Sequence, residues 1–430
     1  MGFRVALGEI CSFNRGASIP RARMRNSGDL LYIHYGDLYK RFDLRIDVEK
    51  PAKPLPFISA DEKIKDSQRL NDQDIVYVLT SETVDDLGHA YLFNNPSGKL
   101  AVSGTETTIV RVERKDIVLP AYLNYLMSSP RFIGELRQYT RGMKVFRVHP
   151  SDVARIEVDL PSIDEQQKVV AILDAVYEKQ QINTQLNGYL AELAQTLYND
   201  WFRDFGHWGG RMPSHWESGV LGDYVSVKRG GSPRPIQEYL SNEGLHWLKI
   251  ADVSGVNGPY ILEIKEHIKE EGLRKTVHLE PGSLVLSNSA TPGIPKILSI
   301  GTCIHDGWLY FPQSEFTNEW LYCYFLNIRQ ELVRMANGSV FQNLKTDIVK
   351  DFEIIRPDDE TLDSFQKIIA PLFGLMEACQ QESKQLAALR DALLPKLMSG
   401  EIDVSKIDLT QLNSHLVERW PSPLQLQDYR

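Results

Sequence analysis

The sequence predicts an α+β fold in which two repeated globular domains are separated by two long antiparallel helices that pack like a coiled coil. Two observations lead to this prediction. In two long stretches, apolar residues recur at alternating steps of four and three, which is the heptad spacing of paired helices. The segments before and between these stretches open and close on matching short motifs, which indicates an internal repeat.

The first helical stretch runs over about residues 162–205 and contains neither Pro nor Gly apart from Gly188. The heptad positions that would face a partner helix form its seam. This seam is apolar at both ends and polar in the middle, where it contains Gln180, Asn183 and Asn187. The apolar positions predicted to form an interface, with the second helix or with another subunit, are Val169, Leu173, Val176, Leu190 and Leu197.

The ends of this stretch carry helix-terminal signals. Ser162 followed three residues later by Glu165 predicts a capping box, and Gly206 predicts the end of the helix. At about 1.5 Å per residue the helix would be on the order of 60 Å long, too long to be covered by one small core. It therefore needs a partner helix.

The second stretch, from Phe365 to about Met398, shows the same alternation and is again polar at its centre, around Glu382. Pro371 is expected to start or kink this helix. Because one chain carries two similar seams, we expect the helices to pack on each other, and antiparallel packing would place the two globular segments at opposite ends. The alternative is that each helix lies on its own domain. The interface positions predicted here are Ile368, Leu372, Leu375, Leu386, Leu389 and Leu393.

Length and charge narrow the class of protein. A chain of 430 residues has room for two or three domains. Its net charge of −9 argues against general, sequence-independent nucleic-acid binding but not against local basic patches. The N-terminal residues do not resemble a signal peptide, and no run of apolar residues is long enough to span a membrane. We therefore expect a cytoplasmic protein with no membrane partner.

The repeat is visible in short motifs. Leu7-Gly8-Glu9 recurs as Leu221-Gly222-Asp223, and Arg15-Gly16-Ala17-Ser18 recurs as Arg229-Gly230-Gly231-Ser232, each pair 214 residues apart. Each copy then continues with strand-like segments and closes on a helix rich in aromatic residues. The expected division is a first globular domain at 1–160, a central helical spacer at 161–206, a second globular domain at 207–357, a C-terminal helical spacer at 358–400 and a tail at 401–430.

A search for catalytic chemistry finds little. The sequence has no Gly-rich adenosylmethionine loop, Walker loop, HExxH or GxSxG motif. The four cysteines form no CxxC pair, and the two His-Trp pairs in residues 207–216 are interpreted as packing aromatics rather than metal ligands. We therefore expect neither a catalytic residue nor a metal site.

Basic and amide side chains gather in two loops of each copy. A run of charge is often only a solvated surface, but here both copies of an acidic chain place such side chains in equivalent loops. Arg and Lys can neutralise phosphates, while Arg can read guanine edges and Asn adenine edges. The candidate DNA-binding residues are Arg15, Arg21, Arg23, Arg25, Arg141, Lys144, Lys228, Arg229, Arg234, Asn343 and Lys345.

With these motifs the chain resembles, over nearly its whole length, the DNA-specificity subunit of type I restriction-modification systems. The resemblance rests on the Arg-Gly-(Ala or Gly)-Ser openings, on Glu165-Gln166-Gln167 at the start of the first helix and on Trp201-Phe202 at its end. The segment 393–402 after the second helix fits as well. The second helix departs from the pattern at its start, which reads Ser364-Phe365-Gln366, so the two helix starts are unequal.

The resemblance implies a non-catalytic subunit whose globular domains are target-recognition domains. Each would read one half of a bipartite DNA site, while the helices would set the spacing and dock methyltransferase subunits. The implied partners are double-stranded DNA, two modification subunits that methylate adenine, and restriction subunits. The chain itself would hold no cofactor, since S-adenosylmethionine and ATP are expected on the partner subunits. The alternatives are a stand-alone bipartite DNA-binding protein or scaffold, and a chain that is itself a methyltransferase or nuclease.

Overall fold

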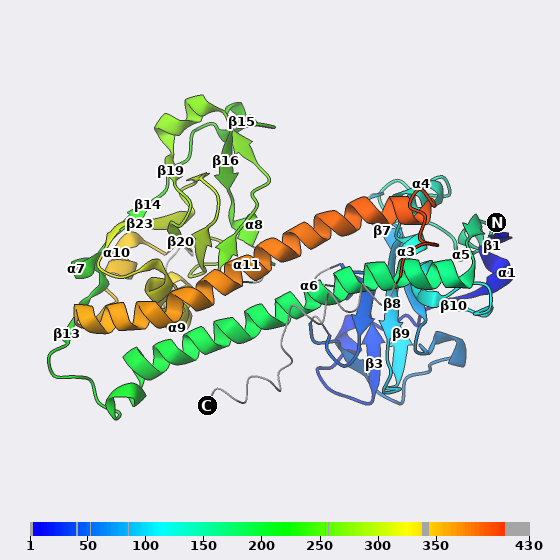
Figure 1. Ribbon diagram of the computed structural model, residues 1–430, viewed down its shortest axis with the longest axis horizontal. Helices are drawn as coiled ribbons and strands as arrows, with labels where there is room; N and C mark the ends of the chain where they lie inside the picture. Colours follow the sequence, from blue (N-terminus) through cyan, green and yellow to red (C-terminus); the bar gives the residue numbers. More distant parts are fainter. Residues whose placement is uncertain are drawn as a thin grey trace. The chain divides into compact units, whose positions relative to one another are not determined.

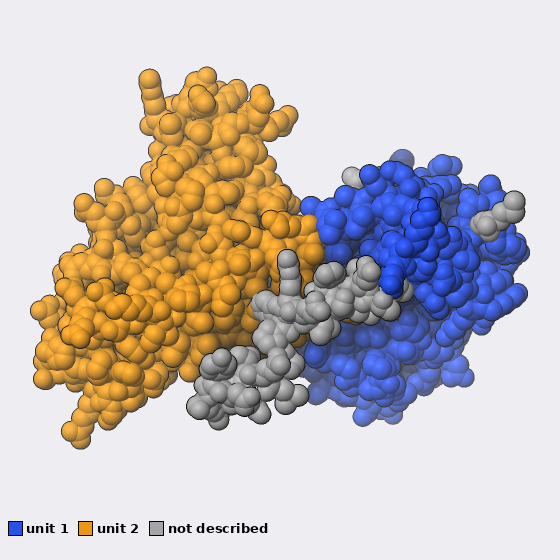
Figure 2. Space-filling model, viewed as in Figure 1, with its two compact units in different colours: residues 1–177, 388–430 blue, residues 178–387 orange. Residues whose placement is uncertain are grey.

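The computed structural model describes residues 3–39, 42–51, 53–84, 86–253, 255–256, 258–337 and 344–408 (Figure 1). The chain divides into two compact units, coloured separately in Figure 2: residues 1–177 with 388–430, and residues 178–387. Each unit contains one globular head and a segment of both long helices. The first head comprises the elements from β1 to β12, and the second head those from β13 to β24.

The first head is built on a five-stranded sheet with the order β2, β10, β6, β8, β4. Neighbouring strands are antiparallel except for the parallel pair of β4 and β8. A smaller sheet has the order β5, β3, β9, and two further strand pairs join β1 to β12 and β7 to β11. The strands are β1 (Phe3–Ala6), β2 (Cys11–Arg15), β3 (Leu30–Ile33), β4 (Arg45–Asp47), β5 (Phe57–Ile58), β6 (Ile75–Val78), β7 (Thr80–Ser81), β8 (His89–Asn94), β9 (Ala101–Ser103), β10 (Thr107–Val112), β11 (Phe146–Arg147) and β12 (Glu157–Leu160).

Side chains of the central strand β6 alternate between two cores, because successive residues of a strand point to opposite faces. Ile75 and Tyr77 lie in the core that includes the helices α3 and α4, whereas Val76 and Val78 lie in the core shared with β3. Both faces of the sheet are thus covered, which explains why β6 is apolar throughout. The helices of this head are α1 (Leu7–Ile10), α2 (Tyr35–Leu38), α3 (Pro120–Met127), α4 (Pro130–Arg137) and α5 (Pro150–Val153).

The second head repeats this topology. Its main sheet has the order β14, β23, β20, β21, β17, again with one parallel pair at the edge, between β17 and β21. Its smaller sheet has the order β15, β18, β16, β22, β19, and β13 pairs with β24 as β1 does with β12. The internal repeat predicted from the sequence is confirmed by this agreement in strand order.

The elements of the second head have the following bounds. The strands are β13 (Glu217–Val220), β14 (Val225–Arg229), β15 (Leu240–Ser241), β16 (Leu245–Leu248), β17 (Tyr260–Ile261), β18 (His267–Ile268), β19 (Val277–Leu279), β20 (Leu284–Ser287), β21 (Pro295–Leu298), β22 (Thr302–Ile304), β23 (Trp308–Ser314) and β24 (Glu353–Arg356). The helices are α7 (Leu221–Tyr224), α8 (Ile250–Val253), α9 (Asn318–Asn337) and α10 (Thr346–Lys350).

The first long helix, α6 (Ile163–Tyr198), begins with the predicted capping box. The Ser162 backbone N–H donates to a Glu165 carboxylate oxygen at 2.9 Å, and the Glu165 N–H donates to Ser162 Oγ at 3.3 Å. At its other end α6 passes into a π-helical turn, Asn199–Arg203. The chain then turns at Phe205, which has φ of 54°, one residue before the Gly206 that we had predicted as the end.

The second long helix, α11 (Asp359–Met398), pairs with α6 in antiparallel fashion within each unit. In the first unit, Val169 and Leu173 share a core with Leu394 and Leu397. In the second unit, the C-terminal part of α6 from Leu190 to Tyr198, with Phe202 of the π-helical turn, shares a core with the N-terminal part of α11, from Phe365 to Met376. The predicted coiled-coil-like pairing is therefore confirmed.

The polar middle of the predicted seam lies in the second unit. Asn183 Nδ2 donates to Glu382 Oε2 at 2.9 Å, and Gln180 Nε2 donates to the Ser383 carbonyl at 3.1 Å. Lys179 Nζ also lies 2.9 Å from Glu382 Oε2. These contacts join α6 to α11 by hydrogen bonds where apolar packing is interrupted.

The apolar seam of α11 is shifted relative to the heptad that we had read from the sequence. Phe365, Ile369, Phe373 and Met376 are buried, because this face of α11 packs on α6 and on aromatic side chains of the second head. Ile368, Leu375 and Leu389 are instead between 42% and 47% exposed. They take no part in the buried pairing, and their role in an interface with another subunit stays a prediction. Pro371 lies inside the continuous helix and does not start it.

Candidate nucleic-acid interface

The Arg-Gly motif of each head lies where a strand of the main sheet ends. Arg15 is the last residue of β2, and Arg229 is the last residue of β14. A Cβ atom at Gly16 would lie 2.0 Å from the nearest carbonyl oxygen, and one at Gly230 would lie 2.3 Å from the equivalent oxygen. Only Gly permits this close approach of two backbone segments. The glycine therefore fixes the arginine that precedes it at the end of the strand.

A hairpin of residues 141–147 lies beside this strand end in the first head. Arg141 and Arg147 exchange two backbone hydrogen bonds of 2.9 and 2.8 Å, and Gly142 makes the turn with φ of 115°. Arg15, Arg141 and Arg147 line one cavity of about 710 Å³. The structure thus brings together the two loops in which the sequence had placed candidate residues. Arg147 was not among the predicted candidates. The signal that could have identified it is Gly142, because a turn at this glycine brings Arg147 beside Arg141.

Acidic side chains hold several of these arginines in place. Arg141 Nη2 lies 3.0 Å from the buried carboxylate of Asp152, and Arg147 Nη2 lies 3.5 Å from Glu106. Both guanidinium groups remain largely exposed. A partly exposed pair of this kind contributes little to stability, but it limits the directions in which the guanidinium can point.

The 3₁₀ turn Arg21–Arg23 carries two further candidates with acidic partners. Arg21 Nη2 lies 3.6 Å from Asp37 Oδ1, and Arg23 Nη1 lies 3.2 Å from Glu62 Oε2. These two residues do not line the cavity beside the hairpin. They belong to the same loop as Arg15 but are held by carboxylates on other segments.

Other candidates have no such partner. Within the part of the chain that the structure describes, Arg15, Arg25, Lys144 and Lys228 form no ion pair, and all four are exposed. Arg15 lines the cavity, and Lys144 stands in the sequence between Gly142 and Val145, which also line it.

In the second head one carboxylate organises the Arg-Gly motif. Asp306 accepts a hydrogen bond from Ser232 Oγ at 2.6 Å and lies 3.4 Å from Arg234 Nη2 and 3.9 Å from Arg229 Nη2. The Ser232 hydrogen bond, and then the charge of Arg229, hold the pKa of Asp306 below its usual value. Asp306 was not among the residues predicted from the sequence, because its partners lie more than 70 residues away in the chain.

The segment after the second candidate loop is anchored at an equivalent strand end in both heads. The Val148 N–H donates to the Leu79 carbonyl at 3.0 Å, and the Leu344 N–H donates to the Asn288 carbonyl at 2.8 Å. Leu79 and Asn288 each directly follow the equivalent strands β6 and β20. Lys345 follows this anchor and is exposed, whereas Asn343 lies outside the described residues.

The arrangement can present hydrogen-bond donors to an anionic surface that carries hydrogen-bond acceptors. Guanidinium and ammonium groups lie at equivalent ends of the two main sheets, some free and some oriented by carboxylates. Such groups bind phosphate oxygens and the acceptor edges of bases. The carboxylates also explain how an acidic chain can carry these clusters without a strongly basic surface.

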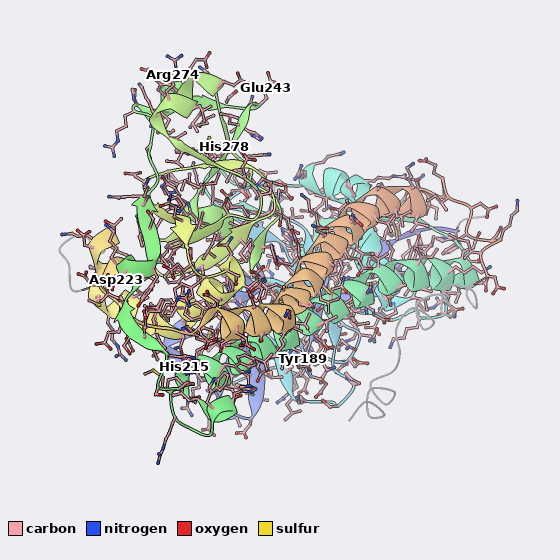
Figure 3. All side chains as sticks on the ribbon, turned by 60° about the vertical axis from the view of Figure 1, so that its left-hand side comes forward. Tyr189, His215, Asp223, Glu243, Arg274 and His278 are labelled. Carbon is pink, nitrogen blue, oxygen red and sulfur yellow. The ribbon has the colours of Figure 1, made fainter. Side chains whose placement is uncertain are left out.

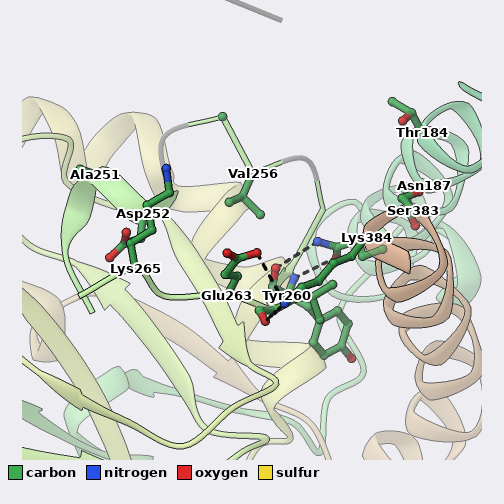
Figure 4. Close-up of a pocket in the computed structure, with 13 residues that line it drawn as sticks. Thr184, Asn187, Ala251, Asp252, Val256, Tyr260, Glu263, Lys265, Ser383 and Lys384 are labelled. Carbon is green, nitrogen blue, oxygen red and sulfur yellow. Dashed lines mark hydrogen bonds and ion pairs between the residues drawn. The ribbon is translucent and has the colours of Figure 1, made fainter. Parts of the chain in front are cut away.

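A second kind of polar contact fixes each head to the helices. Figure 4 shows a pocket of about 570 Å³ in the second unit, lined by Tyr260 of β17 and by side chains of α11. The Gln380 side-chain amide of α11 donates to the Tyr260 carbonyl and accepts from the Tyr260 N–H, at 3.0 and 3.1 Å. In the first unit, Arg45 of β4 bonds Asp174 of α6, and its guanidinium lies 4.9 Å from the centre of the Tyr177 ring. The edge strand of each main sheet is thus attached to a long helix.

The long helices leave apolar side chains exposed on their outer sides. On α6 these include Ile182, Tyr189 and Leu193, and Tyr189, labelled in Figure 3, is 68% exposed. Ile368 and Leu375 of α11 are exposed as well, and we call these five side chains of the two long helices the exposed apolar row of the second unit. Several large exposed apolar side chains are typical of a surface that contacts another protein.

Comparison with known proteins identifies the class. A family model described as the type I restriction modification DNA specificity domain matches the chain twice, at residues 4–191 and 213–385. The two matches cover most of the chain and coincide with the two heads and their helices. The chain therefore belongs to this family.

Individual relatives agree with the family. The chain is 25% identical over 318 residues to the type I restriction enzyme MjaIX specificity subunit of Methanocaldococcus jannaschii, covering 68% of this chain and 71% of that protein. It is 23% identical over 368 residues to the HindI specificity subunit of Haemophilus influenzae, covering 67% and 78%.

Among solved structures, the fold is similar to the crystal structure of a type I restriction-modification S subunit from M. genitalium. The TM-score is 0.57 at 15% sequence identity, and the match covers 92% of this chain and 96% of that one.

Within the residues that the structure describes, no helix combines the length and the apolar character that a membrane crossing requires.

Proposed function

We propose that this chain is the non-catalytic specificity subunit of a type I restriction-modification complex, in which each head reads one half of a bipartite DNA site. The observation that carries the proposal is the equivalence of the two candidate sites. In both heads the Arg-Gly motif lies at the end of the equivalent strand, β2 or β14, and the residue after the second loop, Val148 or Leu344, is hydrogen-bonded at the end of β6 or β20. Two copies of one reading module suit a site with two separate halves.

The long helices would set the gap between the two half-sites. Helix α6 has 36 residues and α11 has 40, and at about 1.5 Å per residue such helices are on the order of 55–60 Å long. The edge-strand contacts of Arg45 and Gln380 tie each head to a helix. The domain boundaries at 1–160, 161–206, 207–357, 358–400 and 401–430 belong to this proposal.

The exposed apolar row of the second unit is the proposed docking surface for modification subunits. In this proposal two such subunits bind S-adenosylmethionine and methylate an adenine in each half-site, and restriction subunits use ATP. The specificity subunit binds the DNA and holds its partners on it, without contributing a reacting group. Co-purification with a methyltransferase would separate this function from that of a stand-alone DNA-binding protein.

An arginine substitution in the first head tests the proposed DNA contact. We expect Arg15→Ala to weaken binding of the assembled complex to its recognised duplex about tenfold, since one unpaired guanidinium contact is lost. Fluorescence anisotropy with the methylated sequence found in the host genome measures the affinity. A phosphate contact would weaken binding to all sequences and lower the salt dependence, whereas a base contact would relax one position.

Arg114→Ala is the matched control. Arg114 lies just beyond Val112, at the opposite end of β10 from Thr107, which lines the cavity beside Arg15. Its guanidinium is exposed and pairs with Asp116 at 2.8 Å. We expect its substitution to leave the affinity unchanged. Equal losses in both variants, or none in Arg15→Ala, would contradict the proposed interface.

A further inference from the structure

The tip of the 141–147 hairpin carries an apolar side chain that no described residue covers. Met143 is 92% exposed, more than any other large apolar side chain in the described part of the chain. Val145, two residues later, is 39% exposed. An exposed thioether side chain does not stabilise the fold, because its apolar surface stays in water. Burial by a binding partner would remove that surface from water and so explain its position.

The hairpin is held in place before any partner binds. The two backbone hydrogen bonds between Arg141 and Arg147 close it, and Arg147 pairs with Thr80 of β7. A Cβ atom at Gly142 would lie 2.0 Å from the Val145 carbonyl oxygen, so the turn is tight. Phe146 packs against the first core. Because the loop is already ordered, little conformational entropy is lost when its tip contacts a ligand.

The charges around the tip indicate what the partner is. Lys144 adjoins Met143, and Arg141 and Arg147 form the base of the hairpin. Arg15 lines the same cavity as these two arginines. The hairpin thus carries cationic side chains beside its apolar tip and at its base, which fits a polyanion that carries apolar groups between its charges. Duplex DNA has this pattern, with phosphates on both sides of a groove and base edges at its floor.

On the base edges of the major groove, the apolar group is the C5-methyl of thymine, and this groove is wide enough for a two-stranded hairpin. We infer that Met143 packs against a thymine methyl in the half-site that the first head reads, and so helps to determine its sequence. This inference rests on the proposed function. The hairpin tip would thus recognise a base by apolar contact, while the arginines would recognise bases by hydrogen bonds.

Removing the DNA methyl group tests this contact directly. The assembled complex is titrated with duplexes of its recognised site in which each thymine, one at a time, is replaced by deoxyuridine. We expect the wild-type complex to lose about fourfold in affinity at one thymine, the effect of one buried methyl group. We expect Met143→Ala to bind the unmodified site about tenfold more weakly and to be insensitive to the same replacement.

Met143→Leu is the matched variant, because it keeps an apolar side chain of similar volume. It should retain the loss at that thymine. The inference is overturned if wild type and Met143→Ala show the same profile across all thymines, or if the wild type loses nothing at any of them. A wild-type complex that binds recognised and unrelated duplexes equally well would instead overturn the proposed function itself.

Discussion

Asp306 shows how a carboxylate can serve a surface that binds an anion. It repels phosphate, yet it accepts the Ser232 hydrogen bond and lies beside Arg229 and Arg234. The Ser232 hydrogen bond lowers its pKa, which shows that this contact favours the charged carboxylate. An arginine side chain is long and has many rotamers, so a fixed carboxylate that restricts it reduces the entropy lost on binding.

Asp306→Asn separates these two effects. We expect the variant complex to bind unrelated DNA more tightly, because a negative charge facing phosphates is gone. We expect its preference for the recognised site to fall about tenfold, because the arginines lose a charge-assisted partner. Competition between recognised and unrelated duplexes measures this preference.

Asp116→Asn is the control for that experiment. Asp116 is exposed and pairs with Arg114 beyond the far end of β10, so its substitution should leave the preference unchanged. An unaltered preference in Asp306→Asn would show that Asp306 does not position the arginines.

Some residues of the site could be predicted from the sequence and others could not. Gly16 and Gly230 could be recognised from the sequence. Two backbone segments come too close at this point to admit a Cβ atom, so both copies carry Gly at the same position. Asp306 was not, because it stands as an isolated acid in the sequence and its partner Ser232 is 74 residues away. Sequence patterns reveal local constraints better than contacts between distant loops.

At the scale of elements, the polar middle of α6 and α11 lowers the stability of the helix pair. Asn183 is 1% exposed; its Nδ2 bonds Glu382, but its Oδ1 has no partner among the described residues. A buried acceptor without a hydrogen bond costs free energy. Polar residues within a seam commonly fix the register of the pair at such a cost.

Asn183→Leu should therefore stabilise the second unit. We expect its free energy of unfolding to rise by about 1–2 kcal/mol, because the unpaired oxygen is replaced by apolar packing. Glu382 keeps its partner Lys179 in the variant. Urea unfolding followed by tryptophan fluorescence reports on this unit, since all tryptophans except Trp420 lie within it.

Gln185→Leu is the control, because Gln185 is exposed on the same helix. It should change the stability by less than about 0.5 kcal/mol. A destabilised Asn183→Leu would mean that the bond to Glu382 outweighs the unpaired oxygen.

The helices also mark where heptad counting succeeds and where it fails. It predicted the pairing of α6 with α11, and the separate spacing of Ser162 and Glu165 predicted the capping box, because both signals can be read from nearby residues. It misplaced the buried face of α11, taking Ile368 and Leu375 instead of Ile369 and Met376. Adjacent apolar positions of α11 cannot be ranked from spacing alone, since this helix packs on aromatic side chains of the second head as well as on α6.

At the scale of the whole molecule, the recognition of bases and the spacing of the half-sites would belong to different parts of the chain. Each head would determine which bases are read, through its strand-end loops. The long helices would determine only the number of base pairs between the two half-sites. The repeat and the helices were predictable from the sequence, whereas the attachment of each edge strand by Arg45 or Gln380 became visible only in the fold.

Lengthening both helices tests this separation most directly. One heptad is inserted between Tyr177 and Glu178 of α6 and another between Ala387 and Ala388 of α11, which keeps the seam in phase. Each helix becomes longer by about 10 Å, which corresponds to about three base pairs of duplex.

The measurement is the sequence methylated in cells that carry the variant complex, read by sequencing their modified DNA. We predict that both half-sites keep their bases and that the gap between them grows by about three base pairs. Changed bases within a half-site, or an unchanged gap in a complex that still methylates, would contradict the account.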